Sequence, residues 1–226
     1  MSNADTIKHD NLIEAYDEDY YERGVIVGKS GYMNYRWMPE MTLRMAHFMI
    51  QNLGLKQGQR VLDFGCAKGF LVKAFRILDI DAEGIDVSEY AIRMVDTELR
   101  DHCRLITGVE DENCFVGNYD ILIAKDVFEH LTEEQVRTLL VRAKNSCKRV
   151  FAAIPLAADD DIGSFIVPEY NKDITHITAK SFNWWQNLFI DCGWKIEDAS
   201  FNCIGIKENW TRYWPEGNGF YTLISD

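Results

Sequence analysis

The chain has 226 residues, with 24 Lys or Arg against 36 Asp or Glu, so its formal net charge at pH 7 is −12. Its composition, 47% hydrophobic and 27% charged, is that of a globular protein long enough for one domain with a substantial core. An acidic chain repels phosphate backbones, and no apolar run approaches the ~20 residues of a membrane span. We therefore expect neither nucleic acid nor a membrane as a partner.

The chain has six cysteines, with no C-x-x-C pair and no histidine at zinc-finger spacing beside any of them. This usage predicts buried thiols in a reducing compartment. Residues 1–14 are polar and lack the apolar segment of a signal peptide, so we expect a cytoplasmic location.

Residues 11–53 are rich in aromatic side chains and end in a helical run of methionines. The aromatic residues are Tyr16, Tyr20, Tyr21, Tyr32, Tyr35 and Trp37, and the methionines are Met41, Met45 and Met49. We predict a helical N-terminal extension over residues 1–55 that packs on the core, covers the substrate as a lid, or does both. Residues 56–226 would form the main domain, in one folding unit with the extension.

From residue 61 onward, short β-rich runs alternate with amphipathic helical patterns. The expected strands are residues 61–64, 82–87, 104–107, 119–124 and 149–154, and the expected helices are residues 70–78, 91–99, 132–143 and 182–192. Thr132 and Gln135 have the spacing of a capping box at the third of these helices. Apolar strands alternating with such helices predict an α/β fold whose parallel sheet is covered on both faces.

Residues 156–178 form a long connection between a strand and a helix, a length typical of lids and binding loops. In a parallel sheet this connection lies at the carboxyl ends of the strands, where ligands bind in open α/β folds. The acidic run at residues 159–161 has metal-binding groups but is better explained as surface charge, so we expect no metal site.

The first strand runs into a turn, residues 63–69, that reads D-x-G-x-x-x-G. Gly65 allows a sharp turn against which a ligand can approach the backbone, and Gly69 lets the next helix begin close to the sheet. A dinucleotide-binding turn would read G-x-G-x-x-G, but Ala67 and Phe70 stand at its second and third glycine positions. The turn therefore argues against a pyrophosphate site.

The second strand ends at Asp86, 21 residues after Gly65, where a carboxylate can accept hydrogen bonds from both hydroxyls of a ribose. Asp63, at the tip of the first strand, would repel a pyrophosphate but attract a cationic amino-acid group. The two acids together indicate a ligand that carries an amino acid on a ribose.

The segments VLDFGCAKGF, GIDVS, ITGVED and YDILIAKDVFEHL, in this order, resemble the cofactor half of class I S-adenosylmethionine-dependent methyltransferases. The later IPL, THIT and DCGWKI segments and a closing aromatic strand at residues 219–223 are similar to the rest of that family. The resemblance implies a Rossmann-like, doubly wound, mostly parallel seven-stranded sheet with helices on both faces and a helical N-terminal cap. It also implies S-adenosylmethionine as cofactor and S-adenosylhomocysteine as product.

Carried over position by position, the resemblance implies a set of cofactor-binding residues. They are Asp63, Gly65, Ala67 and Gly69 in the first turn, Asp86 at the ribose, Val87, Val109 and Glu110 at the adenine, and Lys125 beside the reactive methyl. Ala67 and Lys68 replace the family's commoner Gly and Thr or Ser, and Val109 stands where a Gly-Asp pair is often found. Glu110 fits a solvated loop acid equally well.

For the acceptor we expect a hydroxyl or an amine of a small soluble molecule, such as a sugar or another metabolite. A hydroxyl requires a general base, and the candidates are His176, for acceptor contact, and His130, for the lining of the methyl pocket. Either histidine could instead only brace a loop. The candidate lid and substrate contacts are Tyr20, Tyr21, Tyr32 and Asp126.

Three alternatives stay open: a methyltransferase that acts on a protein or nucleic acid, a noncatalytic cofactor-binding subunit, and a nicotinamide-dependent oxidoreductase. The sequence lacks the Asn-Pro-Pro-Tyr signature associated with methylation of base amino groups. The glycine spacing argues against the oxidoreductase. A homodimer is compatible with all of these readings.

Overall fold

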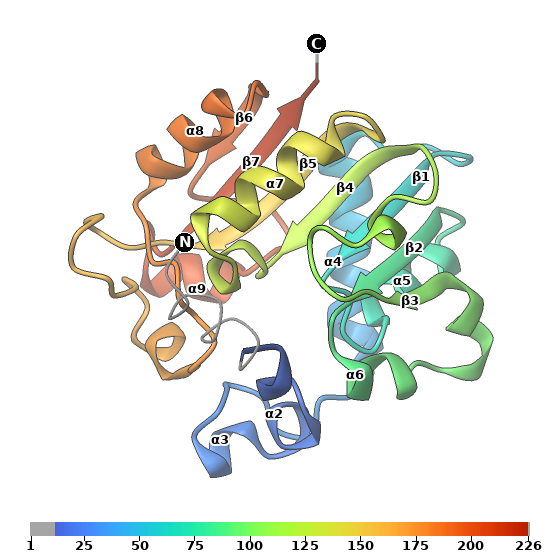
Figure 1. Ribbon diagram of the computed structural model, residues 1–226, viewed down its shortest axis with the longest axis horizontal. Helices are drawn as coiled ribbons and strands as arrows, with labels where there is room; N and C mark the ends of the chain where they lie inside the picture. Colours follow the sequence, from blue (N-terminus) through green and yellow to red (C-terminus); the bar gives the residue numbers. More distant parts are fainter. Residues whose placement is uncertain (1–11, 226) are drawn as a thin grey trace.

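The computed structural model describes residues 12–225, which form a seven-stranded sheet with helices on both sides (Figure 1). The strand order is β3-β2-β1-β4-β5-β7-β6. The strands are β1 (Arg60–Phe64), β2 (Asp81–Asp86), β3 (Cys103–Leu105), β4 (Tyr119–Lys125), β5 (Cys147–Pro155), β6 (Lys195–Ser200) and β7 (Asn218–Ile224). Each strand from β1 to β5, and β7, covers a segment expected from the sequence.

Strand direction is where the sheet departs from expectation. The neighbours from β3 to β5 pair in parallel, but β7 runs antiparallel to both β5 and β6. The sheet is therefore mixed, and the expectation of a mostly parallel sheet holds only for its first five strands. An alternating or apolar run predicts a strand but carries no information about its direction.

The helices divide between the two faces of the sheet. They are α2 (Glu18–Glu22), α3 (Gly24–Val27), α4 (Pro39–Leu53), α5 (Phe70–Ile77), α6 (Glu89–Arg93), α7 (Glu133–Ala143), α8 (Phe182–Asp191) and α9 (Glu208–Tyr213). Short 3-10 turns are η1 (Thr97–His102), η2 (Glu112–Cys114), η3 (Phe128–His130) and η4 (Pro168–Lys172). Figure 1 shows α7 and α8 on one side of the sheet and α4 and α5 on the other.

Alternation along the strands explains the two layers. Val61 packs with α4 and α5, whereas its neighbour Leu62 packs with α7 and α8, because successive strand side chains point to opposite faces. Both residues are fully buried. The central strands are apolar on both sides and therefore require helices on both.

One helix expected from the sequence ends differently in the structure. The helix expected at residues 91–99 is interrupted: α6 ends at Arg93, and an extended Asp96 separates it from η1. The six cysteines are free, and only Cys203 is not fully buried, as expected for structural thiols. Within residues 12–225 no helix combines the length and the apolar character needed to cross a membrane.

The N-terminal segment, residues 12–35, sits at the carboxyl ends of the first strands. Lys68, in the β1–α5 turn, is 6% exposed; it forms an ion pair with Glu22 and donates a 2.8 Å hydrogen bond to the carbonyl of Tyr35. Ser88 donates a 2.6 Å hydrogen bond to the carbonyl of Tyr16. The expected extension begins at residue 1, but residues 1–11 lie outside the described part of the chain.

Candidate active site

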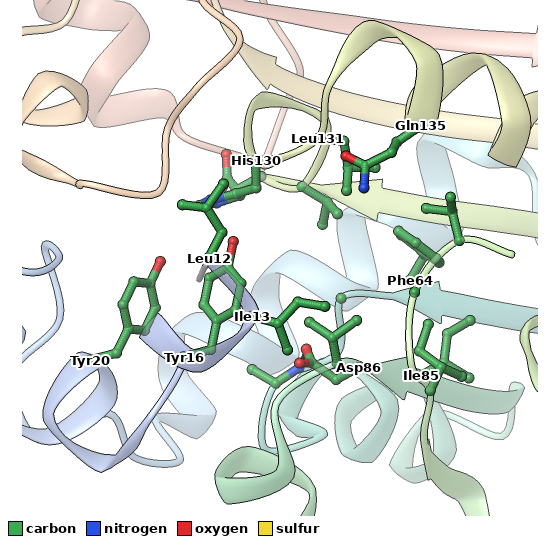
Figure 2. Close-up of a pocket in the computed structure, with 18 of the residues that line it drawn as sticks. Leu12, Ile13, Tyr16, Tyr20, Phe64, Ile85, Asp86, His130, Leu131 and Gln135 are labelled. Atoms are coloured by element: carbon green, nitrogen blue, oxygen red, sulfur yellow. Dashed lines mark hydrogen bonds between the residues drawn. The ribbon is translucent and has the colours of Figure 1, made fainter. Parts of the chain in front are cut away.

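A cavity of about 110 Å³ lies between the N-terminal segment and the carboxyl ends of the sheet (Figure 2). In this view Tyr16 extends between Asp86 on one wall and His130 on another. The lining residues are Leu12, Ile13, Tyr16, Tyr20, Tyr21 and Tyr32 from the N-terminal segment, and Phe64, Gly65, Ala67, Ile85, Asp86, Val87, Ile106, Gly108, Val109, Asp126, Val127, His130, Leu131 and Gln135 from the sheet and its loops.

The β1–α5 turn brings bare backbone to the cavity wall. Gly65, with φ +79°, and Ala67, with φ +48°, both adopt the left-handed conformation. A Cβ on Gly65 would lie 2.6 Å from a methyl of Val127, so this position has no room for a side chain. The turn thus needs glycine at residue 65 for both its conformation and its close approach.

Asp86 ends β2 at the cavity wall and is 7% exposed. One carboxylate oxygen accepts a 2.7 Å hydrogen bond from the amide of Ala67, and the other accepts a 2.7 Å hydrogen bond from the amide of Ser88. Burial raises the pKa of Asp86, and these backbone hydrogen bonds counteract the rise. Because a carboxylate oxygen has two lone pairs, each can accept one further hydrogen bond from a ligand.

Charged side chains cluster around Asp126, which lines the cavity. This residue, in a left-handed conformation with φ +57°, forms ion pairs with Lys125 and Lys207. The two ammonium groups hold the pKa of Asp126 well below its usual range, against the effect of burial. Nearby Asp63 is 4% exposed, and burial raises its pKa to about 7, with Lys125 opposing and Asp86 adding to the rise.

Tyrosine rings form much of the N-terminal wall. Tyr20 contacts the rings of Tyr16, Tyr21 and Tyr32, with centroids 5.1 to 5.7 Å apart. Burial raises the pKa of Tyr20 well above its usual value, so its hydroxyl stays protonated and can donate hydrogen bonds. This wall is apolar in its body and polar at the hydroxyl tips.

The long connection at residues 156–178 meets the N-terminal segment beside the cavity. The Tyr20 hydroxyl donates a 2.8 Å hydrogen bond to Asp173, and the amide of Ile174 donates a 3.1 Å hydrogen bond to the carbonyl of Lys29. The two stretches that interrupt the strand-helix alternation are therefore neighbours in space, at the end of the sheet that the sequence predicts.

The two histidines named as candidate bases pack against each other, with ring centroids 4.6 Å apart. His130 lines the cavity, whereas His176 lies behind it and is not among the lining residues. Burial lowers the pKa of His130 to about 4, with His176 adding to the shift, and burial also lowers the pKa of His176. Both rings are therefore neutral at pH 7.

The structure gathers most of the predicted site residues around one cavity. Those that line it are Gly65, Ala67, Asp86, Val87, Val109, Asp126, His130, Tyr20, Tyr21 and Tyr32. Those that do not are Asp63, Gly69, Glu110, Lys125 and His176; of these, Glu110 is exposed on the surface. Gly69 instead precedes α5, with φ +73°.

Sequence reasoning missed two residues that the structure makes prominent. Tyr16 lines the cavity between Asp86 and His130, but its sequence position does not distinguish it from the other tyrosines of its segment. Glu129 is completely buried beside both histidines. Its position could have indicated a site residue, because Glu129 directly precedes His130 and follows closely after the end of a strand.

Comparison with known proteins supports the family resemblance. Residues 35–197 match the family model described as "Methyltransferase domain". A ubiquinone biosynthesis O-methyltransferase from Bordetella avium is 29% identical over 110 residues, covering 43% of this chain and 46% of that protein. The chain thus spans about half the length of this curated relative.

Solved methyltransferase structures share the fold. A methyltransferase bound to the Trm112 methyltransferase activator of Haloferax volcanii has 15% identity and a TM-score of 0.63, over 83% of this chain and 92% of that one. A SAM-dependent methyltransferase from Archaeoglobus fulgidus has 14% identity and a TM-score of 0.60, over 83% and 97%. The chain therefore belongs to the methyltransferase-domain family, as a class I S-adenosylmethionine-dependent methyltransferase.

Proposed function

We propose that the cavity binds S-adenosylmethionine and that the chain transfers its methyl group to a hydroxyl or amine of a small soluble molecule. The observation that carries this proposal is the position of Asp86. Its buried carboxylate faces the cavity beside the left-handed turn at Gly65 and Ala67. When bound, the cofactor supplies a methyl group on a positively charged sulfur.

The residues present fit the cofactor part by part. The carboxylate of Asp86 would accept hydrogen bonds from the ribose hydroxyls, and the apolar wall with Val87 and Val109 suits an adenine ring. The bare backbone at Gly65 lets the methionine part approach closely. Asp63, below the turn, would favour its ammonium group through the field of the carboxylate.

Of the cofactor residues expected from the sequence, Lys125 and Gly69 would act indirectly, and Glu110 has no contact with the cavity. Lys125 holds Asp126 in place, Gly69 sets the start of α5, and Glu110 is exposed and outside the cavity. We propose no adenine contact through the Glu110 side chain as it stands. Methyl transfer needs alignment and exclusion of water more than it needs a reactive side chain, and alignment alone supplies ~7–11 kcal/mol of the barrier.

The N-terminal segment would act as a lid, and residues 56–226 as the methyltransferase domain proper. The cavity of about 110 Å³ is smaller than the roughly 300–1,000 Å³ of pockets that hold ligands of this size. Binding therefore requires residues such as Tyr16 and Tyr20 to move outward and then close again. The hydrogen bond from Tyr20 to Asp173 makes the loop at residues 156–178 part of the same closure.

A small acceptor is favoured because the tyrosine wall covers the cavity and because the net charge of −12 disfavours nucleic acid. The O-methyltransferase named for ubiquinone biosynthesis, which resembles part of this chain, supports the same class of acceptor. His130 lines the cavity and His176 does not, so His130 would be the histidine that meets the acceptor. The six free thiols support a reducing, cytoplasmic setting.

Titration calorimetry with S-adenosylmethionine and S-adenosylhomocysteine tests the proposal. Asp86→Asn should weaken binding about 10- to 150-fold, since hydrogen bonds to a charged acceptor contribute about 1.5–3 kcal/mol. The matched control is Asp79→Asn, an exposed acid with φ +60° that asparagine tolerates. Equal affinities of the two variants would remove Asp86 from the site, and preferential binding of NADH would refute the function.

A further inference from the structure

Three side chains beside the cavity point metal-binding atoms at one another. They are Glu129 and His130 at the end of β4, in η3, and His176 on the long connection before α8. One ligand atom from each lies within 4.8 Å of the others. The histidines come from segments 46 residues apart, so the fold, and not local sequence, brings them together.

Glu129 is the unusual member of this group. It is 0% exposed, and neither of its carboxylate oxygens has a hydrogen-bond partner among residues 12–225. A buried polar group without a partner is costly, and a buried carboxylate more so, unless a cation or a proton neutralises it. The position therefore calls for a proton or a cation, and no side chain among residues 12–225 donates a hydrogen bond to it.

Hydrogen bonds fix which nitrogen of each ring is free. Nδ1 of His176 lies 2.7 Å from the carbonyl of Tyr170, which can only accept, so Nδ1 carries the proton and Nε2 is bare. The hydroxyl of Thr175 donates to Asp173 at 2.5 Å.

That hydroxyl therefore accepts at its oxygen from Nδ1 of His130, 2.9 Å away. The Nε2 atom of His130 is left with a bare lone pair as well.

A bare imidazole nitrogen of His176 thus faces the unpartnered carboxylate of Glu129, and a ring nitrogen of His130 lies within 4.8 Å of both. The Nε2 atom of His176 lies 4.0 Å from a carboxylate oxygen of Glu129. Zinc lies about 2 Å from each nitrogen or carboxylate-oxygen ligand, so two of its ligands can be at most about 4 Å apart, and this pair lies at that limit.

We propose that Glu129, His130 and His176 form a binding site for a divalent first-row transition-metal ion such as zinc. Two imidazoles and one carboxylate favour such an ion over magnesium, which prefers oxygen ligands. Asp173 supports the site, since it orients His130 through Thr175 and has a carboxylate oxygen 4.0 Å from Nε2 of His176. Asp126 is unavailable because Lys125 and Lys207 already neutralise it.

The site adjoins the cavity through His130, which lines it. Three protein ligands leave a coordination position open, as in catalytic zinc sites. An acceptor hydroxyl bound to the ion at this open position would lose its proton to water more readily than a free hydroxyl does. Its oxygen would then form the new bond to the methyl carbon while the carbon–sulfur bond breaks and its electron pair returns to sulfur. This use of the ion rests on the proposed function, but the binding of the ion does not.

The experiment measures metal binding on the full chain, independently of activity. The protein is stripped with a chelator, and zinc binding is followed by calorimetry and by metal content after dialysis. The parent should bind one zinc ion at this site, and Glu129→Gln and His176→Asn should each weaken that binding about 100-fold or more. Cobalt bound to the parent should show visible absorption bands of a low-coordinate nitrogen and oxygen site without thiolate charge transfer.

Matched controls separate the possible failures. His47→Asn removes an exposed histidine and should keep the zinc affinity of the parent. Asp86→Asn should lose cofactor affinity and keep zinc, so the metal site and the proposed function can fail separately. Zinc retained with parental affinity in both Glu129→Gln and His176→Asn, or cobalt spectra dominated by thiolate bands, would place the ion on cysteines and overturn the proposal. So would a parent that binds no zinc or cobalt.

Discussion

The Tyr20 hydroxyl donates a 2.8 Å hydrogen bond to the carboxylate of Asp173, joining residues 153 positions apart in the chain. Tyr20 is 3% exposed, and the Asp173 side chain is 8% exposed. The bond connects the N-terminal segment to the loop at residues 156–178 at the cavity. It also holds Asp173 where that residue orients the hydroxyl of Thr175.

Tyr20→Phe should loosen both segments together. Loss of a buried hydrogen bond to a charged group lowers the unfolding free energy by about 1.5–3 kcal/mol. If the lid detaches alone, the free energy of this local opening falls by the same amount. Amide hydrogen exchange should speed up in residues 12–35 and 156–178 alike. The control is Tyr213→Phe, whose hydroxyl belongs to a 71% exposed side chain. Faster exchange in only one of the two segments would show that they do not move as a unit.

Asp63 should make the stability of the protein depend on pH. Its pKa is about 7 in the folded chain, against 3.8 for an exposed aspartate, because the carboxyl is buried. Between these two values the folded state binds the extra proton, so its contribution to stability is complete below about pH 4 and is lost as the pH rises to about 7. The slope reaches about 1.4 kcal/mol per pH unit.

Asp63→Asn should flatten this slope, since the amide does not titrate. Urea unfolding of the parent and the variant from pH 4.5 to 8 measures the difference, with Asp79→Asn as the exposed control. We expect the variant to gain stability relative to the parent as the pH rises. Parallel pH profiles would mean that Asp63 is already ionised at low pH in the folded chain.

Gly65→Ala should destabilise the protein and narrow the cavity. The alanine would pay for its left-handed conformation, about 1–2 kcal/mol, and its Cβ would collide with Val127 at a further cost of about 1–3 kcal/mol. Gly54→Ala is the matched control, because Gly54 has φ +60° but open space around its missing Cβ. Equal unfolding free energies for the two variants would show that Val127 moves aside freely.

His130→Asn should slow methyl transfer to a hydroxyl acceptor about 10²- to 10⁴-fold and leave the affinity for S-adenosylhomocysteine nearly unchanged. The reason is its place on the cavity wall away from Asp86. His176→Asn should slow turnover comparably if the two rings share an ion, and far less if His130 acts alone as a base. Single-turnover rates with labelled cofactor compare the two, and parental rates in both variants would show that neither histidine serves as the base.

The cofactor end of the fold was predictable from sequence because its signals are local. The apolar run ending at Asp63, the glycine spacing and Asp86 all lie within short segments, and the structure brings Gly65, Ala67 and Asp86 to one cavity as expected. The family resemblance predicted the remaining strands. The direction of a strand, however, depends on its pairing and not on its composition. The reversal of β7 therefore could not be read from its residues.

The acceptor end was less predictable because its chemistry arises from contacts across the chain. His176 is a candidate base by sequence, but its reactive Nε2 atom points toward Glu129, since the carbonyl of Tyr170 takes the other nitrogen. Glu129 looks like an ordinary loop acid until its complete burial is known. No periodicity carries that information.

The reversed strand also constrains the order in which the chain can be assembled. Among the described strands, β6 pairs only with β7, and β7 joins it to β5. During synthesis, β1 to β5 can associate as each emerges. Strand β1 pairs with β2, which follows it directly, and each of β2 to β5 pairs with a strand that precedes it in the chain. The β6 strand must wait without a neighbour in the sheet until residues 218–224 have left the ribosome and inserted between β5 and β6.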